Sequence, residues 1–314
     1  MRSRWPSPDT NTIDGVVSTT PDFPVLDVTD WQVVSLEPAG SDEKVWLSTE
    51  SSRRALFKPN RAHQNQEQGE DWAEKIVAEI AALIQIPAAL VDLASRSGVR
   101  GCLSYNVTPA GFELQPGAAL IGQVVGTDFD PNDRKARGHT LANIAEALAP
   151  YGVPPDFAGP PEIGGFGVFA GYLLLDALVA NRDRHSENWA VLRASSRGVD
   201  TLAPSYDHAS SLGFNLRDDR RDLLLRDTRM FAAFLRKGDA YRFEDSRKNT
   251  LVDYALRALA MAGDLARTFW LDLLTGLDPT QLTFLAARIP TMSDLARSLA
   301  VELLIANRRR LLDG

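Results

Sequence analysis

Cysteine is nearly missing from this sequence. The single cysteine, Cys102, cannot form a disulfide within the chain, so an oxidising compartment is not indicated. Residues 1–18 mix charged residues, proline and aspartate, and they contain no apolar run of the kind found in signal peptides. No stretch approaches the roughly 20 apolar residues that a membrane span requires. We therefore expect a cytoplasmic protein without a membrane span.

An excess of positive charge is also missing. Lys and Arg number 34 against 41 Asp and Glu, which gives a formal net charge of −7. Non-specific binding to nucleic acid depends on a broad basic surface, so we expect no direct nucleic-acid binding. The run Arg308, Arg309 and Arg310 ends the last predicted helix, where positive charge is favourable. It predicts a solvated helix end.

The first third of the chain has the pattern of a small sheet with one helix. Apolar residues make up 44% of the 314 residues, enough for one large domain or for two lobes with cores. The polar, proline-containing segment 1–26 is predicted to be a flexible arm. Strand-like runs follow at 32–38, 44–48 and 54–59, and two more at 88–94 and 101–107. Between them, Trp72, Ile76 and Ile80 recur at helical spacing and predict a helix over 71–84.

The rest of the chain is mainly helical in pattern. Proline and glycine mark 108–117 as a hinge and 150–165 as an irregular surface loop, with a helix predicted at 140–149. Segment 166–180 is nearly all apolar but spans only about 15 residues, which favours a buried helix over a membrane span. Beyond Arg226 the pattern is helical, and Asp278, Pro279 and Gln281 form a good helix start.

The segment 181–188, N-R-D-R-H-S-E-N, carries the most specific chemistry. Asp183 and Asn188 lie five residues apart between a buried helix and a short strand, and Asp207 follows about twenty residues later, in A-P-S-Y-D. Phosphoryl transfer requires a carboxylate near the acceptor hydroxyl and oxygen ligands for magnesium. Asp and Asn favour turns in any protein, but the whole set has the layout of a kinase catalytic loop followed by a metal-binding aspartate.

These residues resemble those of HipA-like serine/threonine kinases, whose catalytic loop N-x-D-x-H-x-x-N is followed by a strand and A-P-x-Y-D. The resemblance runs from about residue 31 to residue 308. It implies an α+β, two-lobed, protein-kinase-like fold: an ATP-binding N-lobe (27–108) with a small antiparallel sheet and one helix, and a larger, mainly helical C-lobe (109–314). It also implies that Asp183 is the catalytic base, that His185 braces the loop and that Asn188 and Asp207 hold Mg²⁺.

A kinase also needs a cation on the ATP phosphates, usually a strand lysine held by a helix glutamate. Lys58, at the end of the third strand, is the candidate, and Lys44 is a second phosphate contact. Glu74 and Glu79 compete as its partner, and the HipA-like spacing favours Glu74. Gly40 and Ser41 lie where a glycine-rich loop should cover the phosphates, although the surrounding motif departs from that of HipA. The family resemblance places adenine on the backbone of 103–106, which includes Leu103 and Tyr105.

Three alternatives concern the acceptor and the activity. Phosphatidylinositol kinases share the string formed by Asp183, Arg184, His185 and Asn188, so a lipid acceptor is the main alternative to a protein acceptor. The third alternative is that the protein is a catalytically inactive binding module. The resemblance also raises an antitoxin-like partner, as in a toxin–antitoxin pair. HipA itself has an additional N-terminal subdomain that contacts its DNA-binding partner, whereas only about 30 residues precede the first strand here, so a HipB-like partner does not follow.

One charged residue stands out in the apolar segment 166–180. Asp176 lies shortly before the proposed catalytic loop. An unpaired charge is costly to bury, so Asp176 is either exposed at the surface or hydrogen-bonded to the loop that it would then orient.

Overall fold

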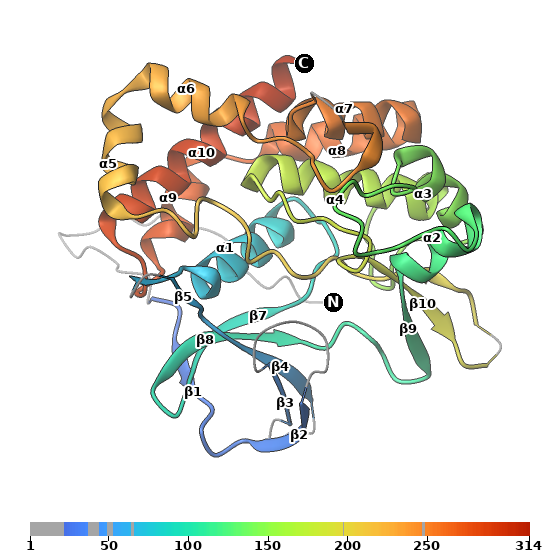
Figure 1. Ribbon diagram of the computed structural model, residues 1–314, viewed down its shortest axis with the longest axis horizontal. Coiled ribbons are helices and arrows are strands. Elements are labelled where there is room, and N and C mark those ends of the chain that lie inside the picture. Colours follow the sequence, from blue (N-terminus) through green and yellow to red (C-terminus); the bar gives the residue numbers. More distant parts are fainter. Residues whose placement is uncertain (1–21, 37–43, 49–52, 64–65, 197, 247–248) are drawn as a thin grey trace, which may run out of the picture.

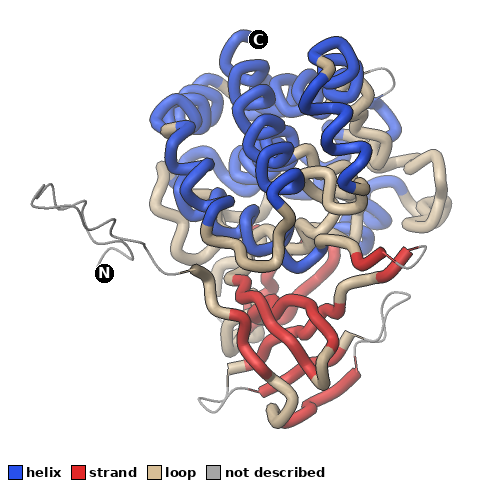
Figure 2. The backbone as a smooth tube through the Cα atoms, turned by 90° about the vertical axis from the view of Figure 1, so that its left-hand side faces the viewer, coloured by secondary structure: helices blue, strands red, loops and turns tan. Residues whose placement is uncertain are grey.

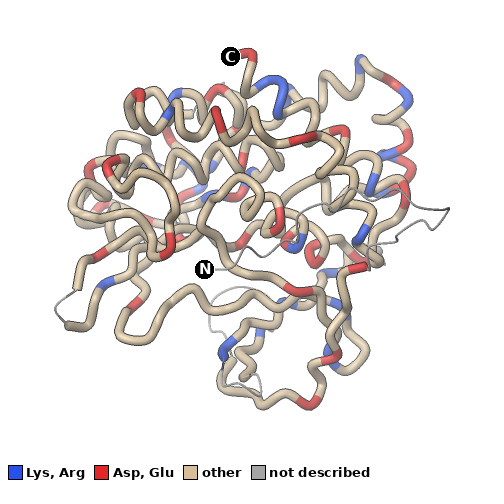
Figure 3. Tube along the Cα trace, turned by 180° about the vertical axis from the view of Figure 1, so that it is seen from behind, with Lys and Arg blue, Asp and Glu red and all other residues tan. Residues whose placement is uncertain are grey.

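The computed structural model describes residues 22–36, 44–48, 53–63, 66–196, 198–246 and 249–314. The chain forms a small lobe of strands and a larger lobe of helices, which lie at opposite ends of the molecule (Figures 1 and 2). The expected α+β architecture with two lobes is confirmed. Seen from behind, acidic and basic positions are interspersed over both lobes (Figure 3).

Within the described residues, the small lobe contains a six-stranded sheet with the order β1-β7-β8-β4-β3-β2. Its strands are β1 (Val25–Asp27), β2 (Gln32–Leu36), β3 (Val45–Ser48), β4 (Arg54–Pro59), β7 (Val91–Arg96) and β8 (Val99–Tyr105). A short pair, β5 (Ala62–His63) and β6 (Gln66–Glu67), precedes the helix. Neighbouring strands of the large sheet are antiparallel except β1 and β7, which are parallel, so the expected antiparallel sheet gains one parallel strand.

The end of the predicted arm belongs to the folded lobe. Phe23 is buried, and its backbone N–H donates to the Arg288 carbonyl at 2.9 Å. Val25 and Leu26 pair with β7. These residues carry no alternation long enough to predict a strand, because β1 has only three residues and gains its stability from a strand nearly seventy residues away in sequence.

Helix α1 (Glu70–Leu83) lies between the sheet and the helical lobe. Its apolar residues are buried as their spacing predicts, and the helix contacts β7 and β8 on one side and α9 on the other. Glycine is required just before it, because a Cβ atom at Gly69 would come within 1.9 Å of the Trp72 ring. The two lobes are thus joined through a helix that is buried over most of its length.

A second, three-stranded sheet follows the connection between the lobes. It has the order β11-β10-β9 and consists of β9 (Phe112–Pro116), β10 (Ala190–Ala194) and β11 (Thr201–Leu202). The second half of the segment 108–117, where a hinge is expected, therefore forms a strand. Phe112 packs on the cluster formed by Ala190, Leu192 and Ala203, so packing outweighs the turn signal of the flanking proline and glycine residues.

The helical lobe is built around α4 (Gly164–Val179), which contacts α3, α7, α8 and α10. The other helices are α2 (Gly117–Val125), α3 (Leu141–Leu148), α5 (Asp218–Arg226), α6 (Thr228–Arg236), α7 (Leu251–Ala262), α8 (Asp264–Gly276), α9 (Pro279–Ala287) and α10 (Asp294–Asp313). Two 3₁₀ turns lie at Pro161–Ile163 and Glu244–Ser246. The predicted buried helix at 166–180 is confirmed.

Segment Pro161–Val179 is long and apolar enough to cross a membrane by length and composition, contrary to our expectation, and 83% of it is buried inside the lobe. The arginine run at the end of α10 is only partly the solvated end that we expected. Arg308 donates to the Leu274 and Thr275 carbonyls, at 3.1 and 2.7 Å, and Arg310 donates to the Leu235 carbonyl at 3.4 Å. Both side chains bind carbonyls in the last turns of other helices.

Candidate active site

A cleft of about 800 Å³ lies where the two lobes meet. Residues of the sheet, the inter-lobe connection, the 181–188 loop and the 203–207 segment line it together. They include Lys44, Trp46, Leu56, Lys58, Ser104, Tyr105, Asn106, Val107, Thr108, His185, Glu187, Asn188, Tyr206 and Asp207. Residues from distant parts of the sequence therefore share one cavity.

Lys58 is the central charge of this cleft. Its Nζ lies 2.6 Å from Glu74 Oε1 and 2.9 Å from Asp207 Oδ1, so it joins β4, α1 and the 203–207 segment. Burial by itself would lower the pKa of Lys58, but Asp207 and Glu74 raise it above its ordinary value. Glu79 instead pairs with Lys75 at 2.7 Å. The structure thus places Glu74, and not Glu79, beside Lys58.

Glu74 and the segment around Asp207 hold one another in place. The second Glu74 oxygen accepts the backbone N–H of His208 at 3.0 Å, and Glu74 is only 1% exposed. Burial, then Arg184, lowers the pKa of His208 to about 3, so this ring is neutral near pH 7. Asp207 has a φ of +62°, a left-handed conformation that Asp tolerates better than most residues. Burial would raise the pKa of Asp207, but Lys58 and Lys44 hold it well below its usual range.

The 181–188 loop is braced from beneath by a buried ion pair. The Arg184 guanidinium donates to both Asp176 oxygens, at 2.7 and 2.8 Å, and both side chains are only 2% exposed. Arg184 also donates to the Asn188 carbonyl at 2.6 Å and to Ser205 Oγ at 3.0 Å. Of the two alternatives for Asp176, the structure shows the buried side chain bonded to the loop. The sequence analysis gave Arg184 no role, although a buried carboxylate in an apolar helix requires a cationic partner nearby.

Asn188 and His185 both line the cleft, and they differ in the hydrogen bonds that they make within the loop. The Asn188 amide donates its Nδ2–H to the Asp183 carbonyl at 2.8 Å, which leaves the amide oxygen available toward the cleft that this residue lines. The ring Nδ1 of His185 accepts the Glu187 backbone N–H at 3.3 Å, and the backbone N–H of His185 donates to the Asp183 carbonyl at 2.9 Å. Burial lowers the pKa of His185 below its ordinary value. These contacts match a bracing position in the loop.

Asp183 is not among the residues that line the inter-lobe cleft. It lines a second groove, of about 460 Å³, so the 181–188 loop borders both. Arg242 donates from Nε to Asp183 Oδ1 at 2.7 Å, and its Nη2 lies 2.6 Å from the same oxygen. The Arg242 carbonyl is held in turn by His139 Nδ1 at 2.7 Å. Sequence reasoning missed Arg242 because no motif connects it to a loop 59 residues earlier.

The residues expected to contact adenine and the ATP phosphates differ in their positions relative to the cleft. Tyr105 lines the cleft, with its hydroxyl donating to Asp92 at 3.0 Å. Leu103 does not line it: this residue pairs with both neighbouring strands, and its side chain is buried in the core of the small lobe. Residues 104–108 border the cleft, so three of the four residues of the expected adenine segment 103–106 line it, and the adenine position stays a prediction. Gly40 and Ser41 lie outside the described residues.

The oxygen atoms at the base of the cleft fit a magnesium ion. Lys58 occupies only Oδ1 of Asp207, and the Asn188 amide has its nitrogen engaged, so one oxygen of each residue remains for a cation. Carboxylate and amide oxygens are suitable ligands for Mg²⁺, which usually takes one or two protein ligands and completes its shell with water and phosphate.

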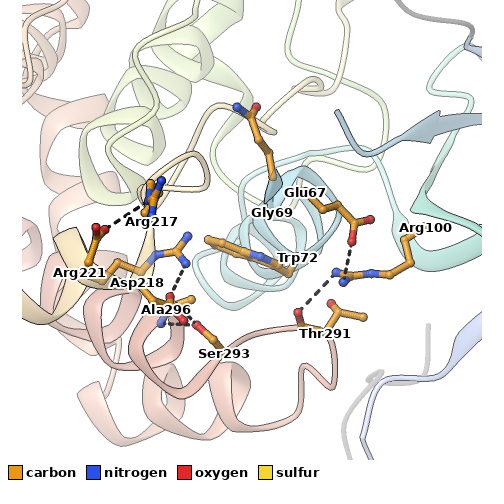
Figure 4. Close-up of a pocket in the computed structure, with 12 residues that line it drawn as sticks. Glu67, Gly69, Trp72, Arg100, Arg217, Asp218, Arg221, Thr291, Ser293 and Ala296 are labelled. Atoms are coloured by element: carbon orange, nitrogen blue, oxygen red, sulfur yellow. Dashed lines mark hydrogen bonds and ion pairs between the residues drawn. The ribbon is translucent and has the colours of Figure 1, made fainter. Parts of the chain in front are cut away.

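Another cavity, of about 410 Å³, lies at the start of α1, and none of the candidate site residues described above lines it. Figure 4 shows Trp72 between Arg100 on one side and Arg217 and Arg221 on the other. These arginines are already matched by carboxylates: Arg100 pairs with Glu67 and Asp71, Arg217 with Asp219 and Arg221 with Asp218. The cavity therefore has no excess charge with which to bind an ion.

Comparison with solved structures defines the class of fold. The crystal structure of CtkA, a Helicobacter pylori proinflammatory kinase, matches with a TM-score of 0.72 and 17% identity over 92% of this chain and 96% of that one. The chain therefore has a protein-kinase-like fold. Weaker likenesses include the Golgi casein kinase with Mn/ADP bound (TM-score 0.47, 11% identity, 94% of this chain and 73% of that one). HipA of Shewanella oneidensis, solved with HipB and operator DNA, gives a TM-score of 0.43 with 12% identity over 90% of this chain and 68% of that one.

No protein-family model and no curated protein matches the chain. The comparisons thus show the kinase-like fold without singling out the HipA-like group.

Proposed function

We propose that this protein is an ATP- and magnesium-dependent kinase that transfers the γ-phosphoryl group to a protein Ser or Thr hydroxyl, in the manner of the HipA-like kinases. The observation that carries the proposal is the position of Lys58, between Glu74 and Asp207 at the base of the inter-lobe cleft. A cation held by a helix glutamate, beside a metal-binding aspartate, is the arrangement that kinases use to position phosphates.

Each residue has a role that follows from its contacts. Lys58, held by Glu74, binds the phosphates, and Asn188 and Asp207 hold Mg²⁺. When bound, the metal neutralises charge on the phosphates. The backbone at 104–108 borders the cleft and receives adenine. Asp183 lines the second groove that the same loop borders, where it orients the acceptor hydroxyl and takes its proton, and His185 braces the loop.

The acceptor class rests on the resemblance to HipA-like kinases. A lipid acceptor and an inactive binding module are the alternatives. An inactive module is disfavoured because the polar residues of the site are all present and, except for Gly40 and Ser41, lie in the described part of the chain. An antitoxin-like partner and a cytoplasmic location stay predictions.

The test is transfer of labelled γ-phosphate from ATP, with Mg²⁺, to lysate proteins and, separately, to phosphatidylinositol vesicles. We expect labelled protein, and Asp183→Ala should reduce turnover by roughly 10²-fold or more while changing ATP affinity only a few-fold, because a general base acts on the acceptor. Labelled lipid without labelled protein would favour the lipid kinase. No transfer to either, from a protein that binds ATP, would favour the inactive module.

A further inference from the structure

The groove beside Asp183 has an unusual balance of charge. It is lined by residues of the catalytic loop, the 210–216 segment, α4, α6, α7, α10 and the connection after α6. Four cations line it, Arg182, Lys237, Arg242 and Arg310, against a single carboxylate, Asp183. The chain as a whole has the opposite excess, a net charge of −7. The groove therefore has an excess of positive charge in a molecule whose net charge is negative.

Two of these cations are already committed to carboxylates. Arg242 pairs with Asp183, and Arg182 pairs with Asp239. Their charges hold the loop and its surroundings in place and are largely compensated. The other two cations of the groove are the ones that an incoming anion would meet.

Lys237 and Arg310 have no carboxylate within ion-pair distance in the described part of the chain. Lys237 is exposed and follows the end of α6. Arg310 is half-buried and donates only to neutral acceptors: the Leu235 carbonyl, Asn307 Oδ1 and Thr250 Oγ1, at 3.4, 3.0 and 3.3 Å. The Asp253 carboxylate reaches Arg310 only through Thr250, to which both side chains are hydrogen-bonded. A partly desolvated guanidinium without an ion-pair partner gains free energy when a carboxylate approaches.

We propose that this groove is the acceptor site and that it selects polypeptide segments in which acidic residues flank the acceptor Ser or Thr. The proposal rests on the proposed kinase function, because Asp183 must act on a hydroxyl held in the groove. Arg242 engages Oδ1 of Asp183, which leaves Oδ2 for that hydroxyl. The hydroxyl oxygen bonds to the γ-phosphorus as the bond to the bridging oxygen breaks; its proton passes to Asp183, and ADP leaves with the electron pair.

An acidic peptide fits the groove better than an anionic membrane surface. Binding to a bilayer needs exposed apolar side chains beside the cations. Of the large hydrophobic residues that the described chain exposes, Tyr241 alone lines the groove. Its ring lies beside Arg182 and Arg242, whose guanidinium carbons are 5.1 and 4.9 Å from the ring centre.

The test measures binding of fluorescent peptides by anisotropy in the absence of ATP. One peptide has a central serine flanked by glutamates, and its match has glutamines in their place. We expect the glutamate peptide to bind more tightly, with an affinity that falls as salt is raised. Lys237→Glu should weaken binding by about fivefold or more, as expected for reversing a charge beside a carboxylate. The matched control is Lys135→Glu, the same change at an exposed lysine away from the groove, and it should alter affinity less than twofold.

The outcomes separate this proposal from the kinase proposal. Equal binding of the two peptides, or equal effects of Lys237→Glu and Lys135→Glu, would overturn the acidic acceptor groove. So would binding of phosphatidylinositol phosphate vesicles that Lys237→Glu abolishes while neither peptide binds. If the glutamate peptide binds as expected but labelled ATP transfers phosphate to no acceptor, the groove stands and the kinase function fails. If phosphate is transferred to proteins without any preference for acidic segments, the kinase function stands and the acidic acceptor groove fails.

Discussion

The buried pair of Asp176 and Arg184 gives the sharpest prediction for stability. Asp176→Asn keeps the size of the side chain and an oxygen for the Asn181 amide, which now donates to Asp176 at 2.7 Å. It removes the only carboxylate that the structure places against the Arg184 guanidinium, which is 2% exposed. The change therefore leaves a buried positive charge with neutral partners.

The expected cost is large. Breaking a buried ion pair by removing one partner typically costs about 3–5 kcal/mol. The entropy of unfolding is about 2.1 cal/mol/K per residue, or roughly 0.66 kcal/mol/K for 314 residues, so Tm should fall by about 5–8 °C. Because Arg184 also holds the Asn188 carbonyl and Ser205, nucleotide affinity should fall as well.

The assay is thermal unfolding of purified wild type and variant at equal concentration. Asp239→Asn is the matched control: it makes the same substitution in the pair with Arg182, whose side chains are 48% and 52% exposed. An exposed pair contributes at most about 1 kcal/mol, so this variant should lose no more than about 1.5 °C. A decrease below 2 °C for Asp176→Asn, or equal decreases for the two variants, would refute the bracing role.

Three further predictions follow from the site. Glu74→Gln should reduce phosphoryl transfer far more than Glu79→Gln, because only Glu74 contacts Lys58; steady-state kinetics decides, and the reverse order would show that Glu79 holds the lysine. Lys58→Met should abolish transfer in the same assay, and retained turnover would remove Lys58 from the phosphate site. Burial lowers the pKa of His139 to about 4 and that of His208 to about 3. As the pH falls, these histidines are protonated in the unfolded chain before they are protonated in the folded protein. The stability that their neutral forms contribute is therefore present above pH 6.5 and is lost as the pH falls toward 4, by roughly 1.4 kcal/mol per pH unit for each histidine. Tm measured from pH 7 to 4 should fall less steeply in His139→Gln, and parallel curves would contradict the prediction.

Local patterns predicted the parts of the fold that local forces determine. The spacing of Trp72, Ile76 and Ile80 located α1, and the capping box formed by Asp278 and Gln281 is present at the start of α9. By contrast, β1, α2 and α5 were missed. Helix α5 is D-D-R-R-D-L-L-L-R, with little apolar periodicity, and it is held by contacts with α6 and α10.

The site was predictable where a motif defines it and not where the fold assembles it. Asp183, Asn188 and Asp207 are readable because their spacing reflects one loop and one strand. Arg242 comes from a connection after α6, and only tertiary structure brings it to Asp183. That Leu103 does not line the cleft was not predictable, because the sequence does not show that this residue has strand partners on both sides.

The central claim is that Lys58, Asn188 and Asp207 form one metal-dependent nucleotide site. The most direct measurement is the Tm of the protein with ATP, in the presence of Mg²⁺ or of a chelator, for wild type and Asp207→Asn. At ATP 100-fold above its Kd, binding adds about 2.7 kcal/mol, which raises Tm by roughly 4 °C. We predict this increase for wild type with Mg²⁺, a much smaller one with chelator, and loss of most of the metal-dependent part in Asp207→Asn. No increase with ATP and any divalent metal would contradict the claim.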